Sequence, residues 1–184
     1  MWLTLATLFL VSGNDSAQAA APIAATSYGE CASGGDSRTL RLDVTVDPTT
    51  IVPTRSQNRD PAAPHTSKVR VTLTNPGSRP LRLTFPSPCF LGYRVEAMDG
   101  REVPPADAPV CAAVLGELAL APGASKTKEF RWTAREGVDS YKPLPAGQYR
   151  ILGTLAKRFC GREGQEEPPL STAPVVVEVR PAAN

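Results

Sequence analysis

Apolar and polar residues alternate in two clear runs in the first half of the chain. In residues 40–46 every second residue is apolar, and Arg41, Asp43 and Thr45 stand between them. Residues 69–73 repeat this pattern. Successive side chains of a strand point to opposite faces, so a period of two predicts a strand with one buried face. We therefore expect the first two strands at these positions.

Turn-forming residues divide the rest of the chain into further short alternating runs. Turns are predicted where asparagine, proline, glycine and aspartate cluster, at residues 75–78, 99–100 and 122–123. The Asp-Gly pair is the strongest hairpin signal among them. Alternating runs follow at residues 81–85, 93–97, 118–120, 130–132 and 175–179. Seven or eight short strands, 19 prolines and no long stripe of helical period predict an all-β fold.

Residues 144–155 are typical of one corner of an immunoglobulin-like sandwich. A Pro-Ala-Gly turn is followed two residues later by Tyr149, and Ile151, Gly153 and Leu155 continue on the same face of the predicted strand. In such a tyrosine corner the tyrosine hydroxyl bonds the backbone a few residues upstream. The fold class that we predict is an immunoglobulin-like antiparallel β-sandwich of seven to eight strands.

The amino terminus predicts export. A short apolar run at residues 3–11 precedes Ala17-Gln18-Ala19, which has the small-x-small form of a signal peptidase site. No lysine or arginine precedes the run, which departs from the usual signal peptide. A membrane anchor is the alternative, but a bilayer span needs about 20 apolar residues. We expect cleavage after Ala19 and a periplasmic or secreted protein.

This interpretation divides the chain into a signal peptide (1–19), an amino-terminal extension containing Cys31 (20–38), the sandwich (39–180) and a short tail (181–184). The length suits one domain with a core of its own. The net charge is only +2 and 6% of the residues are aromatic. Nucleic-acid binding is not expected, because it needs a clustered basic face with stacking side chains.

Four cysteines, Cys31, Cys89, Cys111 and Cys160, lie after the predicted cleavage site. An even number in an exported chain predicts two disulfides, for which sequence alone allows three pairings. A zinc site is disfavoured because no C-x-x-C pair exists and the single histidine, His65, is distant in sequence. Redox catalysis is disfavoured for the same missing spacing.

The expected strand directions choose one pairing. If the strands alternate up and down, the first strand begins at the end of the sandwich where the strand of residues 149–155 finishes. Cys31 and Cys160 would share that end, and Cys89 and Cys111 the opposite one. A disulfide requires Cα atoms within about 7 Å, so Cys31–Cys160 and Cys89–Cys111 are predicted.

No residue set predicts catalysis, a cofactor or a metal site. His65 falls in a proline-rich connection, where a solvated loop is more common than an oriented catalytic base. Glu163, Glu166 and Glu167 cluster in a stretch rich in glycine and proline, which would not hold two carboxylates at a fixed separation. We interpret that cluster as a solvated acidic loop, and we expect that the protein is not an enzyme.

The sequence is compatible with a binding function carried by loops. Residues 55–66 join the first two strands and residues 161–173 join the last two, and rigid sandwiches often carry function on such loops. The expected topology projects them from opposite ends. Cys160 would tie the base of the second loop, which lowers the cost of ordering it on a partner.

Four turn motifs carry a resemblance to a known family. They are N-x-G-x-x-P at residues 75–80, D-G at 99–100, L-x-P-G at 120–123 and P-x-G-x-Y at 145–149. With these motifs, residues 67–156 resemble the BsuPI-type intracellular proteinase inhibitor domain. The resemblance implies an immunoglobulin-like fold and, here in an exported form, a proteinase inhibitor. Pro104 stands where the family has an aromatic residue, and Cys89 and Cys111 fall where it usually has none.

Two functions follow as hypotheses. The first is an extracytoplasmic proteinase inhibitor or regulator, in which Arg158 or Arg162 beside Cys160 would suit a trypsin-like pocket. The second is a non-inhibitory module of the cell envelope that binds a protein or a glycan. The expected partner is in either case extracytoplasmic, and the sequence does not define an oligomeric state.

Overall fold

The computed structural model describes residues 40–53, 65–106, 111–137, 142–160 and 165–181, and the predicted signal peptide and extension lie outside these ranges. The described residues form thirteen strands and no helix. Eight strands have five or more residues and coincide with predicted runs: β1 (Arg41–Asp47), β3 (Ser67–Thr74), β4 (Leu81–Phe85), β5 (Leu91–Ala97), β7 (Gly116–Leu120), β8 (Ser125–Trp132), β9 (Gly147–Leu155) and β13 (Val175–Val179). The shorter strands are β2 (Thr50–Ile51), β6 (Glu102–Val103), β10 (Arg158–Cys160), β11 (Gln165–Glu167) and β12 (Leu170–Ser171).

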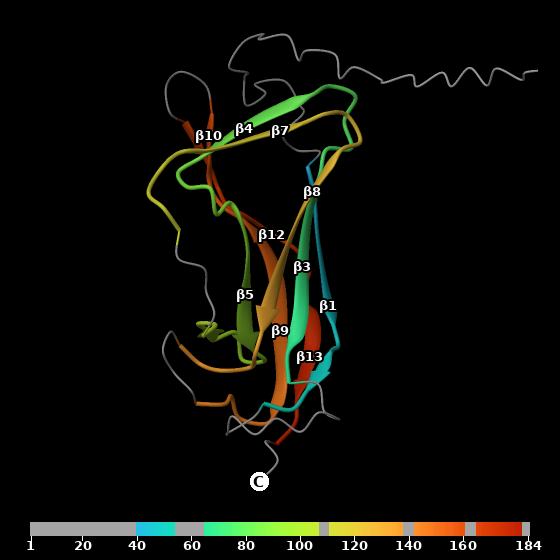
Figure 1. The fold of residues 1–184 in the computed structure, drawn as a ribbon, viewed down its shortest axis with the longest axis vertical. Coiled ribbons are helices and arrows are strands. Elements are labelled where there is room, and N and C mark those ends of the chain that lie inside the picture. Colours follow the sequence, from blue (N-terminus) through green and yellow to red (C-terminus); the bar gives the residue numbers. More distant parts are fainter. Residues whose placement is uncertain (1–39, 54–64, 107–110, 138–141, 161–164, 182–184) are drawn as a thin grey trace, which may run out of the picture.

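Two sheets face each other along the length of the molecule (Figure 1). One has the strand order β1-β3-β8 and the other β2-β13-β9-β5-β6, with β12 beside β9. Neighbouring strands are antiparallel, except for β2, which runs parallel to β13. The first sheet corresponds to strands A, B and E of an immunoglobulin fold, and β5, β9 and β13 correspond to C, F and G. The predicted all-β sandwich is confirmed.

The core fills the space between these sheets. Its buried side chains occupy alternate positions: Val69, Val71 and Leu73 on β3, Tyr149, Ile151 and Leu155 on β9, and Val95, Trp132, Val177 and Val179 on other strands. Gly153 lies among them on the inner face of β9. A Cβ at Gly153 would lie 3.1 Å from Val71 Cγ1 and 3.2 Å from Val44 Cβ, so glycine allows β9 to approach the facing sheet closely.

The tyrosine corner is present as predicted. The hydroxyl of Tyr149 donates a hydrogen bond of 2.9 Å to the carbonyl of Pro145. Leu144 is buried, and its backbone N–H bonds the carbonyl of Ala134. Burial raises the pKa of the Tyr149 phenol above its usual value. Turn, strand and core are therefore tied together at this end of the sandwich.

Asn75 joins two of the predicted turns. Its Oδ1 accepts the N–H of Gly77 at 3.0 Å, which closes the turn after β3. Its backbone N–H and carbonyl bond Ala124 and Gly123 in the turn before β8. Its Nδ2 donates to three further carbonyls, those of Arg79, Leu120 and Ala121. Because Asn75 is almost fully buried, these bonds satisfy an amide that would otherwise be costly to bury.

A third sheet crosses one end of the sandwich (Figure 1), with the strand order β11-β10-β4-β7. We call it the end sheet. The alternating pattern at residues 81–85 correctly predicts β4, but β4 pairs with β7 and β10 instead of running along the sandwich. Alternation alone does not say to which sheet a strand belongs.

The end sheet corrects the predicted placement of the cysteines. The pairing of Leu91 with Leu155 sets the start of β5 beside the finish of β9, so Cys89 lies at the same end as the backbone of Cys160. The prediction of opposite ends was wrong because β4 does not reverse the chain along the sandwich. Cys31 lies outside the described residues, and the Cys31–Cys160 bond stays a prediction.

Candidate functional site

Three chain connections build the end sheet. β4 lies between β3 and β5, β7 lies between β6 and β8, and β10 with β11 lies between β9 and β12. In immunoglobulin variable domains the loops between strands B and C and between F and G meet at one end and carry the binding site. The corresponding connections of this chain also meet at one end, where they form paired strands.

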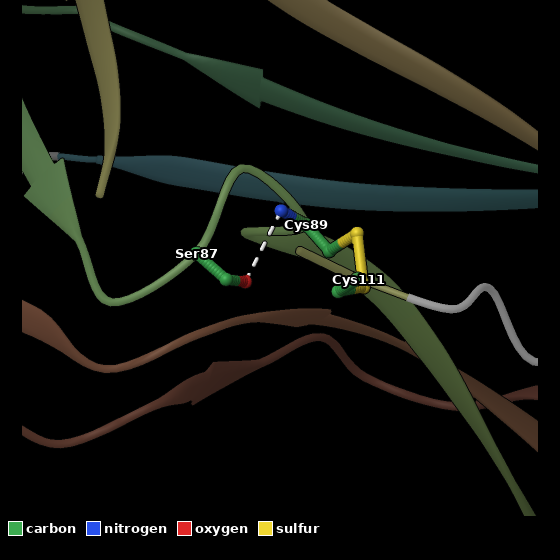
Figure 2. The surroundings of a disulfide bond; sticks show 3 residues. All are labelled: Ser87, Cys89 and Cys111. Carbon is green, nitrogen blue, oxygen red and sulfur yellow. Dashed lines mark hydrogen bonds between the residues drawn. A yellow bond between two sulfur atoms is a disulfide. The ribbon is translucent and has the colours of Figure 1, made fainter. Parts of the chain in front are cut away.

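The disulfide between Cys89 and Cys111, which was one of the two predicted bonds, closes this end (Figure 2). Its Cα atoms are 5.8 Å apart, and the two cysteines are separated by 22 residues in sequence. The N–H of Cys89 donates to Ser87 Oγ at 3.2 Å, so the turn before β5 is fixed as well. The bond attaches the residues that precede β7 to the start of β5.

A close backbone contact fixes the same residues from the other side. Gly116 begins β7 opposite Phe85 of β4, and a Cβ at this position would lie 2.5 Å from the carbonyl oxygen of Ser87. Backbone atoms cannot move aside cheaply, so this approach requires glycine. Phe85 and Phe90 stack at 4.4 Å between ring centroids and flank the turn that Gly116 contacts.

Residues 111–115 lie between these two attachments, and we call them the braced segment. They read Cys-Ala-Ala-Val-Leu, belong to no strand, and all five are exposed. Val114 is 59% exposed and Leu115 is 67% exposed. Met98 and Val176 are the other strongly exposed large apolar side chains of the described residues. Two neighbouring aliphatic side chains in water on a fixed backbone suit contact with a partner.

The predicted loop at residues 161–173 differs from the structure. Residues 161–164, including Arg162 and Glu163, lie outside the described part, but β10 and β11 form a hairpin across them. The backbone of Glu166 pairs with Phe159 and that of Glu167 with Arg158, so these two residues lie in a strand and not in the loop that we expected. The sequence failed here because three-residue strands are too short to show a period.

Arg158 does not present its side chain to solvent. It is only 3% exposed, on the strand β10 that pairs with β4 and β11 in the end sheet. An arginine that enters a trypsin-like pocket must project into the partner, so the proposed role of Arg158 is wrong. The other candidate loop, residues 55–66, falls mostly outside the described residues.

The remaining candidate residues form no reactive arrangement in the described part of the chain. His65 lies outside the strands, as expected, and is half-buried, with its Nδ1–H donating to the carbonyl of Val52 at 2.8 Å. In the described ranges, no three histidine, cysteine, aspartate or glutamate residues gather as metal ligands. A helix long and apolar enough to cross a bilayer is likewise missing from those ranges.

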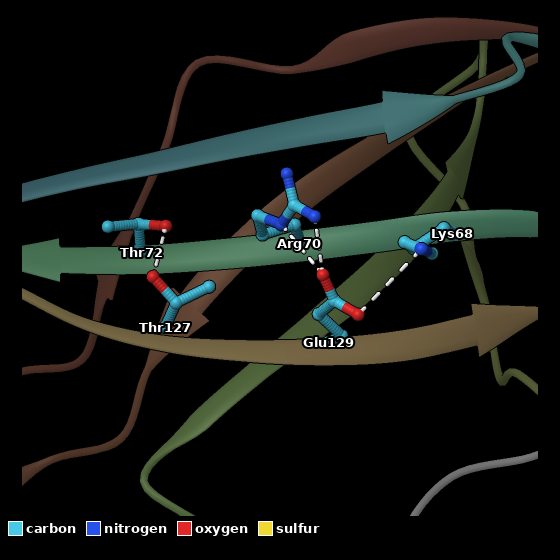
Figure 3. A network of polar contacts seen from close by, with 5 residues as sticks. All are labelled: Lys68, Arg70, Thr72, Thr127 and Glu129. Carbon is cyan, nitrogen blue, oxygen red and sulfur yellow. Dashed lines mark hydrogen bonds and ion pairs between the residues drawn. The ribbon is translucent and has the colours of Figure 1, made fainter.

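The outer face of the first sheet is polar (Figure 3). Arg70 Nε donates to Glu129 Oε1 at 2.9 Å, Lys68 Nζ lies 3.9 Å from Glu129 Oε2, and the hydroxyls of Thr72 and Thr127 are 3.0 Å apart. The hydrogen bond from Arg70 lowers the pKa of Glu129 below its usual value, and the charge of Lys68 acts in the same direction. Such a face is ordinary for the solvated side of an antiparallel sheet.

The sequence did not single out the braced segment. The signal was present as an apolar run without alternation, between Cys111 and a glycine. An exposed apolar run and a buried strand look alike at this length, because neither alternates. The covalent bond and the contact at Gly116 distinguish them, and both depend on the folded chain.

No family model and no curated protein matches the chain, so the BsuPI-type resemblance stays a prediction. Among solved structures, the ApaA protein of Bordetella pertussis is 20% identical, with a TM-score of 0.40 over 76% of this chain and 93% of that one. A CARDB domain from Pyrococcus furiosus, solved with two metal ions, is 16% identical, with a TM-score of 0.34 over 78% and 94%. A β-glucosidase of Erythrobacter marinus is 10% identical, with a TM-score of 0.37 over 77% of this chain and 15% of the enzyme. These low similarities carry no argument about activity.

Proposed function

We propose that the protein is an extracytoplasmic proteinase inhibitor or regulator that presents the braced segment to its target. The observation that carries the proposal is the exposure of Val114 and Leu115 on a backbone fixed at Cys111 and Gly116. A segment that is already ordered loses little conformational freedom when it binds. The mode of action is binding, without catalysis and without a cofactor.

The disulfide supports a place outside the cytoplasm. Structural disulfides form and persist in oxidising compartments and are rare in the cytosol. Cys89–Cys111 agrees with the export that the first 19 residues predict. The periplasm of a bacterium and the extracellular medium both satisfy this requirement.

The side chains of the braced segment define the kind of pocket that would receive them. Alanine, valine and leucine at positions 113–115 are small to medium-sized and uncharged. A trypsin-like pocket recognises a positive charge, whereas these side chains fit a shallow apolar pocket. The expected targets are therefore proteases with a shallow apolar pocket, in place of the trypsin-like proteases that Arg158 would have suited.

A panel of serine proteases and metalloproteases, including enzymes that cleave after small aliphatic residues, tests the proposal. The purified protein is expected to inhibit at least one enzyme at micromolar concentration. Leu115→Asp should weaken that inhibition at least tenfold, since a charge would enter an apolar pocket. The matched control is Val176→Asp, an exposed aliphatic residue of β13.

Absence of inhibition across the panel at micromolar concentration would contradict the inhibitor hypothesis. Pull-down from an envelope extract with the wild-type protein and with Leu115→Asp then tests the non-inhibitory binding module. A protein captured by the wild type and lost by Leu115→Asp would support that alternative, because the braced segment would still be the contact.

A further inference from the structure

Strand β8 forms one edge of the first sheet. All eight of its residues pair with β3, from Ser125 opposite Thr74 to Trp132 opposite Ser67. No strand in the described ranges pairs with its other side. An immunoglobulin fold places a fourth strand, D, at this position. In this chain the connection before β8 supplies β7 to the end sheet instead.

The side chains on the inner face of β8 change from charged to apolar along the direction of the chain. Lys126 is exposed, Lys128 and Phe130 are half-buried, and Trp132 is fully buried. Lys128 Nζ lies 5.1 Å from the centroid of the Phe130 ring. Phe130 in turn contacts Tyr93 of β5, with 5.2 Å between ring centroids. A strand added at this edge would meet two ammonium groups followed by an aromatic pair.

A second copy of the chain does not fit this edge. Antiparallel pairing of β8 with its copy keeps inner positions opposite inner positions. Two registers give the longest overlap between β8 and its copy. One places Lys128 directly opposite Lys128 of the second copy, and the other places Glu129 directly opposite Glu129. Like charges directly opposite each other destabilise a sheet. Lysine on an edge strand also opposes pairing between two copies of the protein. Its positive charge favours an added strand that carries negative charge.

We propose that β8 accepts an added strand from a partner protein, and that this strand carries acidic side chains toward Lys126 and Lys128 and an apolar one toward Phe130. Main-chain hydrogen bonds along β8 supply the affinity, and the alternate side chains supply the specificity. The proposal is independent of the braced segment, which lies in another part of the fold.

A blocked eight-residue peptide is the probe. When it pairs antiparallel to β8, its inner positions carry valine, valine, glutamate and glutamate in chain order, and the positions between them carry threonine. Two control peptides carry glutamine or lysine in place of glutamate. Calorimetry at low salt is expected to show that the glutamate peptide binds at least tenfold more tightly than the glutamine peptide, and that the lysine peptide does not bind. Hydrogen exchange read residue by residue should slow at the amides of β8 when the glutamate peptide is added.

Charge reversal identifies the contact. The double variant Lys126→Glu, Lys128→Glu should prefer the lysine peptide, and Lys128→Gln, a milder change, should weaken the glutamate peptide several-fold. Arg180→Glu, next to β13 in the opposite sheet, should leave peptide binding unchanged. The proposal is overturned if the reversed variant still prefers the glutamate peptide, or if exchange at β8 does not slow. Self-association that protects β8 without a peptide would overturn the choice of partner.

Discussion

The tyrosine corner and the braced segment are both held in place, but by different interactions. At the corner, Tyr149 and Leu144 are buried and the tyrosine hydroxyl is bonded to the backbone of Pro145. At the braced segment, Val114 and Leu115 face solvent while a disulfide fixes the backbone beside them. Burial therefore supplies rigidity at the corner, and a covalent bond supplies it where apolar side chains stay available for contact.

The largest expected effect is the difference in stability between two variants, one that truncates a buried apolar side chain and one that truncates an exposed apolar side chain. Ile151→Ala should lower the free energy of unfolding by about 2–5 kcal/mol, because the side chain is fully buried and leaves a cavity. Leu115→Ala should change it by less than about 0.5 kcal/mol. Urea unfolding of both variants measures the difference. Similar losses in the two variants would show that Leu115 belongs to the core.

The disulfide is expected to have the next largest effect. Cys89→Ser with Cys111→Ser should cost about 3 kcal/mol, because the unfolded chain loses a closed loop of 22 residues. The same variant should bind the target of the braced segment more weakly, since the segment would be ordered only on binding. A variant that unfolds more easily but binds as tightly as the wild type would contradict bracing.

A smaller effect is expected at the tyrosine corner. Tyr149→Phe should cost about 1 kcal/mol, because it removes the hydrogen bond to Pro145 and keeps the ring. Because folding raises the pKa of the Tyr149 phenol, the protonated phenol stabilises the fold fully when the pH is below about 10, the pKa of tyrosine in the unfolded chain. That contribution should disappear as the pH rises through the folded pKa. Thermal unfolding of both proteins at neutral and alkaline pH tests this, and a constant difference would contradict it.

The smallest effect is expected on the polar outer face. The lowered pKa of Glu129 means that ionised Glu129 stabilises the fold fully above the unfolded value of 4.5, and that this stabilisation is lost as the pH falls through the folded pKa. Glu129→Gln should therefore differ from the wild type at neutral pH and converge with it in acid. Unfolding midpoints between pH 3 and 7 measure this, with Glu102→Gln of β6 as the control. Added salt should reduce the difference, because these charges are exposed.

The sequence predicts the strands of the sandwich well because one buried face imposes a period of two. This holds for β3, β9 and the corner at Tyr149. The same logic does not assign β4 to a sheet, since Leu81, Leu83 and Phe85 would alternate in any half-buried strand. The predicted Cys89–Cys111 bond is present although the predicted ends of the sandwich were wrong. Cys89 and Cys111 are brought together by the turn into β5 and by the start of β7, which no local pattern describes.

The candidate site was harder to predict than the fold. Arg158, the described one of the two arginines suggested as contact residues, belongs with Glu166 and Glu167 to a hairpin whose strands are too short to recognise. Val114 and Leu115 carry no unusual chemistry, and only their exposure marks them. Exposure is a property of the folded chain, so it becomes visible only when the contacts around Gly116 are known.

The end sheet also has a consequence for the order in which the protein folds. β4 meets β10 through the pairing of Thr84 with Phe159, which joins an early part of the chain to a late one. Contacts between such distant residues form slowly, because a long loop must close first. Hairpins such as β5 with β6 are local and can form earlier. The pairing of Ile51 with Val179 joins residues that are still farther apart, so the end sheet and the seam between β2 and β13 should both close after the hairpins.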